Sequence, residues 1–132
     1  HYSKVINIEA RTMVKIANKQ LIPAVNAYMG DVASTAAAKQ SVSEKLSIRS
    51  EEKLLDRLSA YADAMSDAVD ALQKIADETA AMTDETAKAH ACHDAVLPAM
   101  AKLRASADAA EEICREDYWP LPCYSRLLFY TE

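Results

Sequence analysis

Residues 50–82 read SEEKLLDRLSAYADAMSDAVDALQKIADETAAM, and the side chains of one face recur at alternating spacings of four and three residues. These positions are Leu54, Leu58, Tyr61, Met65, Ala68, Leu72, Ile75, Thr79 and Met82. The spacing is that of a heptad seam on a long amphipathic helix, with one polar interruption. Ser50 suits the start of this helix, because a serine hydroxyl caps free backbone N–H groups. The stretch therefore predicts a helix over about 50–82.

A second and a third segment with helical periodicity flank this stretch. The seam before it comprises Ile6, Ala10, Met13, Ala17, Leu21, Ala24, Tyr28 and Val32. The seam after it comprises Ala89, His93, Val96, Met100, Leu103, Ala107, Ala110 and Cys114. A serine-rich polar segment separates the first two helices, whereas the turn near 82–84 is short and makes the last two antiparallel neighbours. We therefore expect an all-α protein, an up-down-up bundle of three long helices over about 3–40, 50–82 and 84–117.

Pro23 and Pro98 interrupt the first and third predicted helices in similar settings, Leu-Ile-Pro-Ala-Val and Val-Leu-Pro-Ala-Met. Proline removes a backbone hydrogen bond and crowds the preceding turn, so it kinks a helix or ends it. Apolar periodicity continues through both prolines, and we therefore expect a kink at each. The alternative is a helix boundary at each proline, which would give five shorter helices.

Composition limits the class of protein. The chain has 132 residues, one glycine, three cysteines and a formal net charge of −5. This length suits a single domain with a modest core. The scattered Lys and Arg residues form no basic stripe for a nucleic acid and no polybasic surface for a membrane. An odd number of cysteines in a glycine-poor helical chain fits a reducing compartment. We expect a cytoplasmic protein that binds neither nucleic acid nor membrane.

Residues 118–132, YWPLPCYSRLLFYTE, differ from the rest of the chain. They contain its only Trp, its only Phe and five of its eight aromatic residues. Two prolines one residue apart cannot continue a helix, so we expect residues 1–117 to form the bundle and residues 118–132 an extended aromatic tail. This tail would pack on the bundle or on a parent enzyme. The residues expected to dock are Trp119, Leu121, Tyr124, Leu127, Leu128 and Phe129.

His90, His93 and Asp94 are the candidates for a metal site, because residues three and four apart share one face of a helix. A structural zinc site needs four ligands, and the sequence offers no matching second pair. His93 also falls on the predicted core seam, where a neutral, hydrogen-bonded histidine is commoner than a metal ligand. We therefore expect no metal site. A di-iron bundle is excluded, because no Glu-x-x-His pattern occurs.

The residue patterns of other kinds of catalytic site are also absent from the sequence. No serine lies in a Gly-x-Ser-x-Gly elbow, and Gly30 alone cannot build a phosphate-binding loop. Cys114 and Cys123 have no aligned base that would activate their thiols. We therefore expect no catalytic residue and no cofactor-binding residue in this chain.

Three segments, in order, resemble the C-terminal region of the type III glutamine synthetases. Residues 7–13 and 21–25, NIEARTM and LIPAV, are similar to the opening of that helical region. Residues 93–104, HDAVLPAMAKLR, resemble its third helix. Residues 117–124, DYWPLPCY, followed by Leu-Leu-Phe at 127–129, resemble its extreme C-terminus.

The resemblance implies a non-catalytic C-terminal domain whose parent enzyme ligates ammonia to glutamate, using ATP and Mg²⁺ or Mn²⁺. The family's catalytic Asp-Gly-Ser type and glycine-rich motifs are absent from this chain. No catalytic residue is carried over, and the implied partners are the parent's catalytic domain and neighbouring subunits in stacked six-membered rings. Packing, oligomer assembly or regulation is the implied role.

Two alternatives belong to other classes of function. One is a free-standing helical protein–protein interaction module, because amphipathic helices serve there too and periodicity does not separate the two readings. The other is an enzyme that uses the cluster from His90 to Asp94, which would require a metal retained after chelation.

Overall fold

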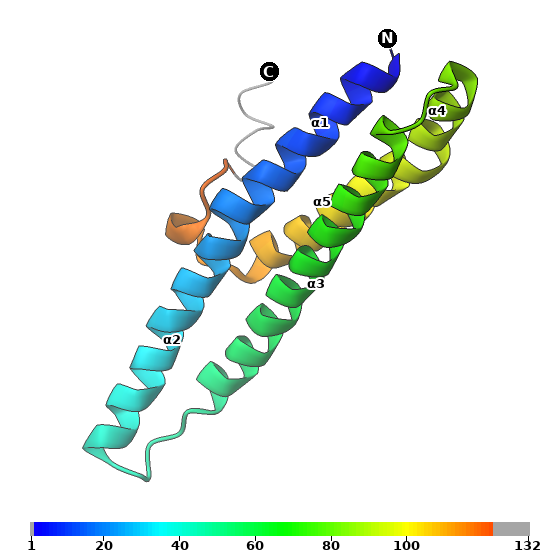
Figure 1. The fold of residues 1–132 in the computed structure, drawn as a ribbon. Helices are drawn as coiled ribbons and strands as arrows, with labels where there is room; N and C mark the ends of the chain where they lie inside the picture. The colour runs from blue at the N-terminus through cyan, green and yellow to red at the C-terminus, as the bar shows by residue number, and fades with distance from the viewer. Residues whose placement is uncertain (1, 123–132) are drawn as a thin grey trace.

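A computed structural model describes residues 2–122, and this range contains helices and no strand (Figure 1). The first long helical segment consists of α1 (Tyr2–Ile16), η1 (Ala17–Leu21) and α2 (Ile22–Val42), and the second is α3 (Arg49–Ala80). The third consists of α4 (Glu85–Ala91), η2 (Cys92–Val96) and α5 (Leu97–Ile113), and a short 3₁₀ helix, η3 (Glu116–Tyr118), follows it. The prediction of an all-α protein with three helices is confirmed.

The three segments run in alternating directions, as Figure 1 shows. The helix α3 lies against both of the others, because it contacts α1 and α2 along one side and α5 and η2 along another. The third segment is shorter than the first, so the far end of α2 pairs with the start of α3 as a two-helix hairpin. Within residues 2–122 no helix has the length and apolar character needed to cross a membrane.

Short polar side chains set the starts of the second and third segments. The Ser47 hydroxyl accepts a hydrogen bond from the backbone N–H of Arg49 at 3.2 Å. The predicted cap, Ser50, therefore lies inside α3, and its hydroxyl donates to the neighbouring glutamate instead. At the other turn the Asp84 carboxylate accepts from the backbone N–H of Thr86 at 3.3 Å and caps α4. Both arrangements satisfy N–H groups that have no partner within the helix.

A wider, π-type turn precedes each internal proline. Before Pro23 the backbone N–H of Ile22 donates to the carbonyl oxygen of Ala17, five residues earlier, and the same pattern precedes Pro98. A proline ring clashes with the carbonyl group four residues before it in an ordinary helix, and a wider turn relieves this crowding. Both segments thus stay helical through the proline, and no helix boundary forms there. The predicted bend of the helix axis stays a prediction.

The extra residue in a wider turn changes which side chains face the core. His93 was predicted on the core seam, but its side chain is 76% exposed, whereas Cys92 is 1% exposed. In the first segment Val14 and Val25 are buried, and their neighbours on the predicted seam, at 13 and 24, are only partly buried. Buried positions 17, 21 and 25 follow one another at a constant spacing of four across this turn.

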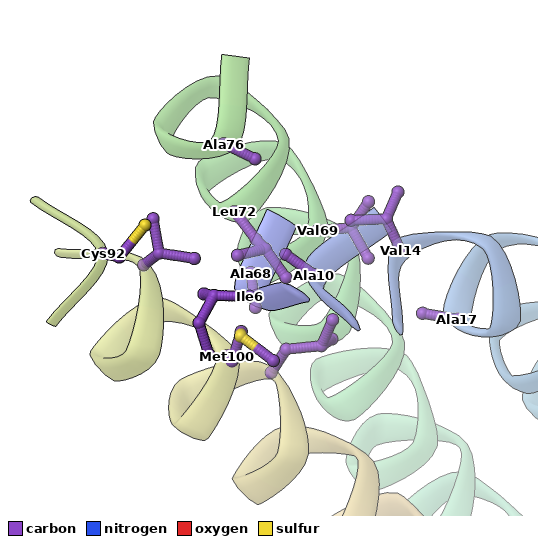
Figure 2. Packing of buried hydrophobic residues seen from close by; sticks show 12 residues of the cluster. Ile6, Ala10, Val14, Ala17, Ala68, Val69, Leu72, Ala76, Cys92 and Met100 are labelled. Carbon is purple, nitrogen blue, oxygen red and sulfur yellow. The ribbon is translucent and has the colours of Figure 1, made fainter. Parts of the chain in front are cut away.

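Two apolar clusters form the core. The larger one joins all three segments (Figure 2). It comprises Ile6, Ala10, Val14, Ala17, Ala68, Val69, Leu72, Ala76, Cys92, Val96, Met100 and Leu103. The second comprises Leu21, Val25, Leu58, Ala62, Met65 and Ala110. Alanine is frequent in both clusters, so the helix backbones approach closely and the core depends on a few large side chains.

Ion pairs and a hydrogen bond fasten the first segment to α3 outside the core. Arg11 pairs with Asp77, and this hydrogen bond holds the pKa of the Asp77 carboxyl below its usual value. Lys39 pairs with Glu51 at the hairpin end and lowers the pKa of that carboxyl in the same way. The Asn7 side-chain amide donates to a backbone carbonyl of α3 at 3.3 Å.

We predict that Leu72→Ala destabilises the domain by about 2–5 kcal/mol, because Leu72 is 0% exposed and its loss leaves a cavity between three helices. The measurement is the free energy of unfolding from urea titration. The control is Asp70→Lys, an exposed position on the same helix, which should change that free energy by less than about 0.5 kcal/mol. Equal effects of the two substitutions would show that the seam of α3 is misassigned.

Candidate docking site at the C-terminal turn

The third segment ends earlier than predicted. Its last helical residue is Ile113, and Cys114 is extended, with a ψ of 133°. One turn of 3₁₀ helix, η3, follows before the chain becomes extended again at Trp119. In Figure 1 this orange turn lies beside the first segment, near the junction of α1 and α2. The chain therefore turns back over its own bundle at residues 114–119.

A cluster of five polar and aromatic residues, which we call the Arg115 clasp, holds this turn against α2. It comprises Tyr28, Asp31, Arg115, Asp117 and Tyr118. The Tyr118 hydroxyl donates to Asp31 at 3.0 Å, and the Arg115 guanidinium donates to both carboxylate oxygens of Asp117 at 2.6 and 2.9 Å. The guanidinium lies 4.8 Å from the centre of the Tyr118 ring and 5.9 Å from that of Tyr28. Such bidentate and stacked contacts fix the orientation of an arginine.

The clasp shifts the pKa values of its members. The hydrogen bond from Arg115 lowers the pKa of the Asp117 carboxyl, and the same bond raises the pKa of the guanidinium. The hydrogen bond to Asp31 raises the pKa of the Tyr118 hydroxyl, and burial adds to this effect. The hydrogen bonds of the clasp therefore all form when both carboxylates are charged and the Tyr118 hydroxyl is protonated.

Next to the clasp, Trp119 packs against the second core cluster and is partly buried. Its ring forms one wall of a cavity of about 290 Å³, which we call the tail groove. Met13, Ile16 and Leu21 line the groove from the first segment, and Leu103 and Ala107 line it from α5. Leu121 and Pro122 border it, and Leu121 is 39% exposed.

Two of the six predicted docking residues lie within the part of the chain that the structure describes. Trp119 contacts the bundle of its own chain, and Leu121 lies at the mouth of the tail groove. The other four, Tyr124, Leu127, Leu128 and Phe129, lie outside the described residues. Docking by the whole set stays a prediction.

The metal candidates lie on the exposed side of the third segment. The Nδ1 atom of His93 is 2.9 Å from the Asp94 carboxylate, and both side chains are largely exposed. Among residues 2–122 no three His, Cys, Asp or Glu side chains gather closely enough to hold a metal ion. Cys92 and Cys114 are buried free thiols, and burial raises the pKa of Cys114.

A protein-family model matches the first helical segment. Residues 1–40 match the family model described as "Glutamine synthetase C-terminal domain". This match supports a glutamine synthetase C-terminal helical domain. The matched range covers α1, η1 and α2 except its last two residues. No curated protein and no solved structure matches the chain.

Reasoning from sequence missed the Arg115 clasp. Asp31 and Tyr118 are 87 residues apart, and no periodicity relates an arginine beyond one helix to a carboxylate on another. Tyr28 was predicted as a seam residue, and it is partly buried. Its tilted ring contact with Tyr118, at 5.3 Å between centres, follows only from the turn at 114–119.

We predict that Tyr118→Phe slightly lowers the melting temperature at pH 7, because it removes the hydrogen bond to Asp31 and keeps the ring contacts. A group whose pKa is raised by folding stabilises the fold below its unfolded pKa, about 10 for tyrosine, and this contribution disappears as the pH rises through the folded pKa. The difference between the two proteins should therefore disappear at alkaline pH. Thermal melts across this range measure it.

The control for this experiment is Tyr2→Phe, which alters an exposed tyrosine on α1 far from the clasp. It should leave the melting temperature unchanged at every pH. A difference for Tyr118→Phe that persists unchanged at alkaline pH would contradict the role assigned to the hydroxyl.

Proposed function

We propose that this chain is the non-catalytic C-terminal domain of a type III glutamine synthetase. The observation that carries the proposal is the match of residues 1–40 to the glutamine synthetase C-terminal domain. The resemblances at residues 93–104 and 117–129 follow in family order and support the type III assignment. The parent enzyme would use ATP and Mg²⁺ or Mn²⁺ to ligate ammonia to glutamate in the cytoplasm.

The role we propose for the domain is packing or oligomer assembly, with regulation as a consequence of either. Exposed apolar side chains on the first two turns of α1 support this role. Tyr2, Val5 and Ile8 are 47%, 45% and 57% exposed, and their spacing of three residues places them on adjoining parts of one helix face. An apolar stripe at a helix surface is typical of a contact with another protein surface. The proposed partners are the parent's catalytic domain and neighbouring subunits.

The chemistry of the chain supports a non-catalytic role. A glycine-rich loop that binds phosphate groups needs backbone amides that can approach the anion, and the single glycine of the chain, Gly30, lies within the regular helix α2. The alternative function, a free-standing helical interaction module, would use the same exposed stripe on α1. The two proposals differ in what they expect in the reading frame of the parent gene, because only the first expects the catalytic motifs of a synthetase there.

The test begins with the reading frame that precedes His1, which should encode an Asp-Gly-Ser type motif and a glycine-rich ATP-binding motif. In the parent protein, Val5→Asp with Ile8→Asp should shift the particle mass from complete rings towards smaller species, as measured by sedimentation velocity. The control, Ser34→Asp, changes an exposed position on α2 and should leave the particle mass unchanged. A frame without these motifs would refute the synthetase assignment, and unchanged rings in the double variant would refute the assembly role.

A further inference from the structure

The tail groove is an apolar depression with one charged rim. Its floor is formed by side chains of the first segment and of α5, among them Ile16, Leu21 and Leu103. Asp108 and Glu111 lie along the α5 side, with Arg104 one turn before Asp108. Apolar surface of this kind is stabilised when another apolar group excludes water from it.

The last described residues of the chain lie at this groove. Trp119 forms a wall of the groove, and Leu121 and Pro122 border it. The next ten residues, CYSRLLFYTE, contain Leu127, Leu128 and Phe129 in succession. Ten residues extend up to about 33 Å. The lining residues of α5, from Leu103 to Glu111, span only about 12 Å along that helix. The segment is therefore long enough to follow the groove from end to end.

Charge also matches between the groove and this segment. Burial and the neighbouring Asp108 raise the pKa of the Glu111 carboxyl, and a cation beside it would stabilise its charged form. No cation within residues 2–122 forms an ion pair with Glu111. Arg126 is the only basic residue among residues 123–132, and it directly precedes the apolar run.

We propose that residues 123–132 return into the tail groove of their own chain, with Leu127, Leu128 and Phe129 on the apolar floor and Arg126 beside Glu111. Because Trp119 and Leu121 already hold the start of the segment at the groove, its effective concentration there is high, and this favours the same chain over a second copy. The proposal concerns the chain alone and does not rest on the synthetase assignment.

Limited digestion of the full chain with chymotrypsin tests this docking, because cleavage after Tyr124 or Phe129 requires that the segment leave the groove. Cleavage should be at least about tenfold slower than in a free peptide of residues 119–132. Ala107→Trp fills the groove and should raise the cleavage rate to that of the peptide. Its matched control, Ala105→Trp, lies at an exposed position of α5 outside the groove and should leave the rate unchanged.

A charge exchange distinguishes docking from a general loss of structure. Glu111→Lys should raise the cleavage rate several-fold, and adding Arg126→Glu should restore it, which unfolding of the bundle cannot produce. Asp70→Lys on α3, combined with Arg126→Glu, should give no such recovery. Cleavage of the unmodified chain at the rate of the peptide would overturn the proposal. Protection that grows with protein concentration, together with a dimer in sedimentation, would also overturn it, because the tail would then occupy a second copy.

Discussion

The burial of α3 between the other two segments is the interaction on which the rest of the structure depends. Leu58, Met65 and Leu72 are each 0% exposed, and they contribute the largest side chains that α3 brings to the two core clusters. The first and third segments both pack their buried side chains against α3. An isolated helix is marginal in water, so the first and third segments gain their stability mainly by covering α3.

The two π-type turns keep this burial continuous through the prolines. Each lies directly before a proline, and each places two side chains in the core, Ala17 and Leu21 in η1 and Cys92 and Val96 in η2. A helix that ended at Pro23 would separate α1, which packs in the larger cluster, from α2, which packs in the second. The clasp then adds a local fastening, because it joins the end of the third segment to the middle of the first.

The periodicity of residues 50–82 was enough to predict the central helix and its buried face, since Leu58, Met65, Ala68 and Leu72 are all buried. It was not enough for His93, because a constant helical repeat cannot register the extra residue of a π-type turn. The predicted cap at Ser50 was wrong because α3 already begins at Arg49, whose backbone N–H donates to the Ser47 hydroxyl. Contacts such as the hydrogen bond from Tyr118 to Asp31 depend on tertiary geometry and leave no local pattern.

Native-state hydrogen exchange tests the central role of α3 most directly. If its burial supports the whole fold, the backbone amides from Leu58 to Ala76 exchange only through global unfolding, with the same free energy as urea denaturation. The amides of the last turn of α2, at the two-helix end of the bundle, should exchange with a smaller free energy. Exchange in the middle of α3 with a smaller free energy than in α1 and α5 would contradict the account.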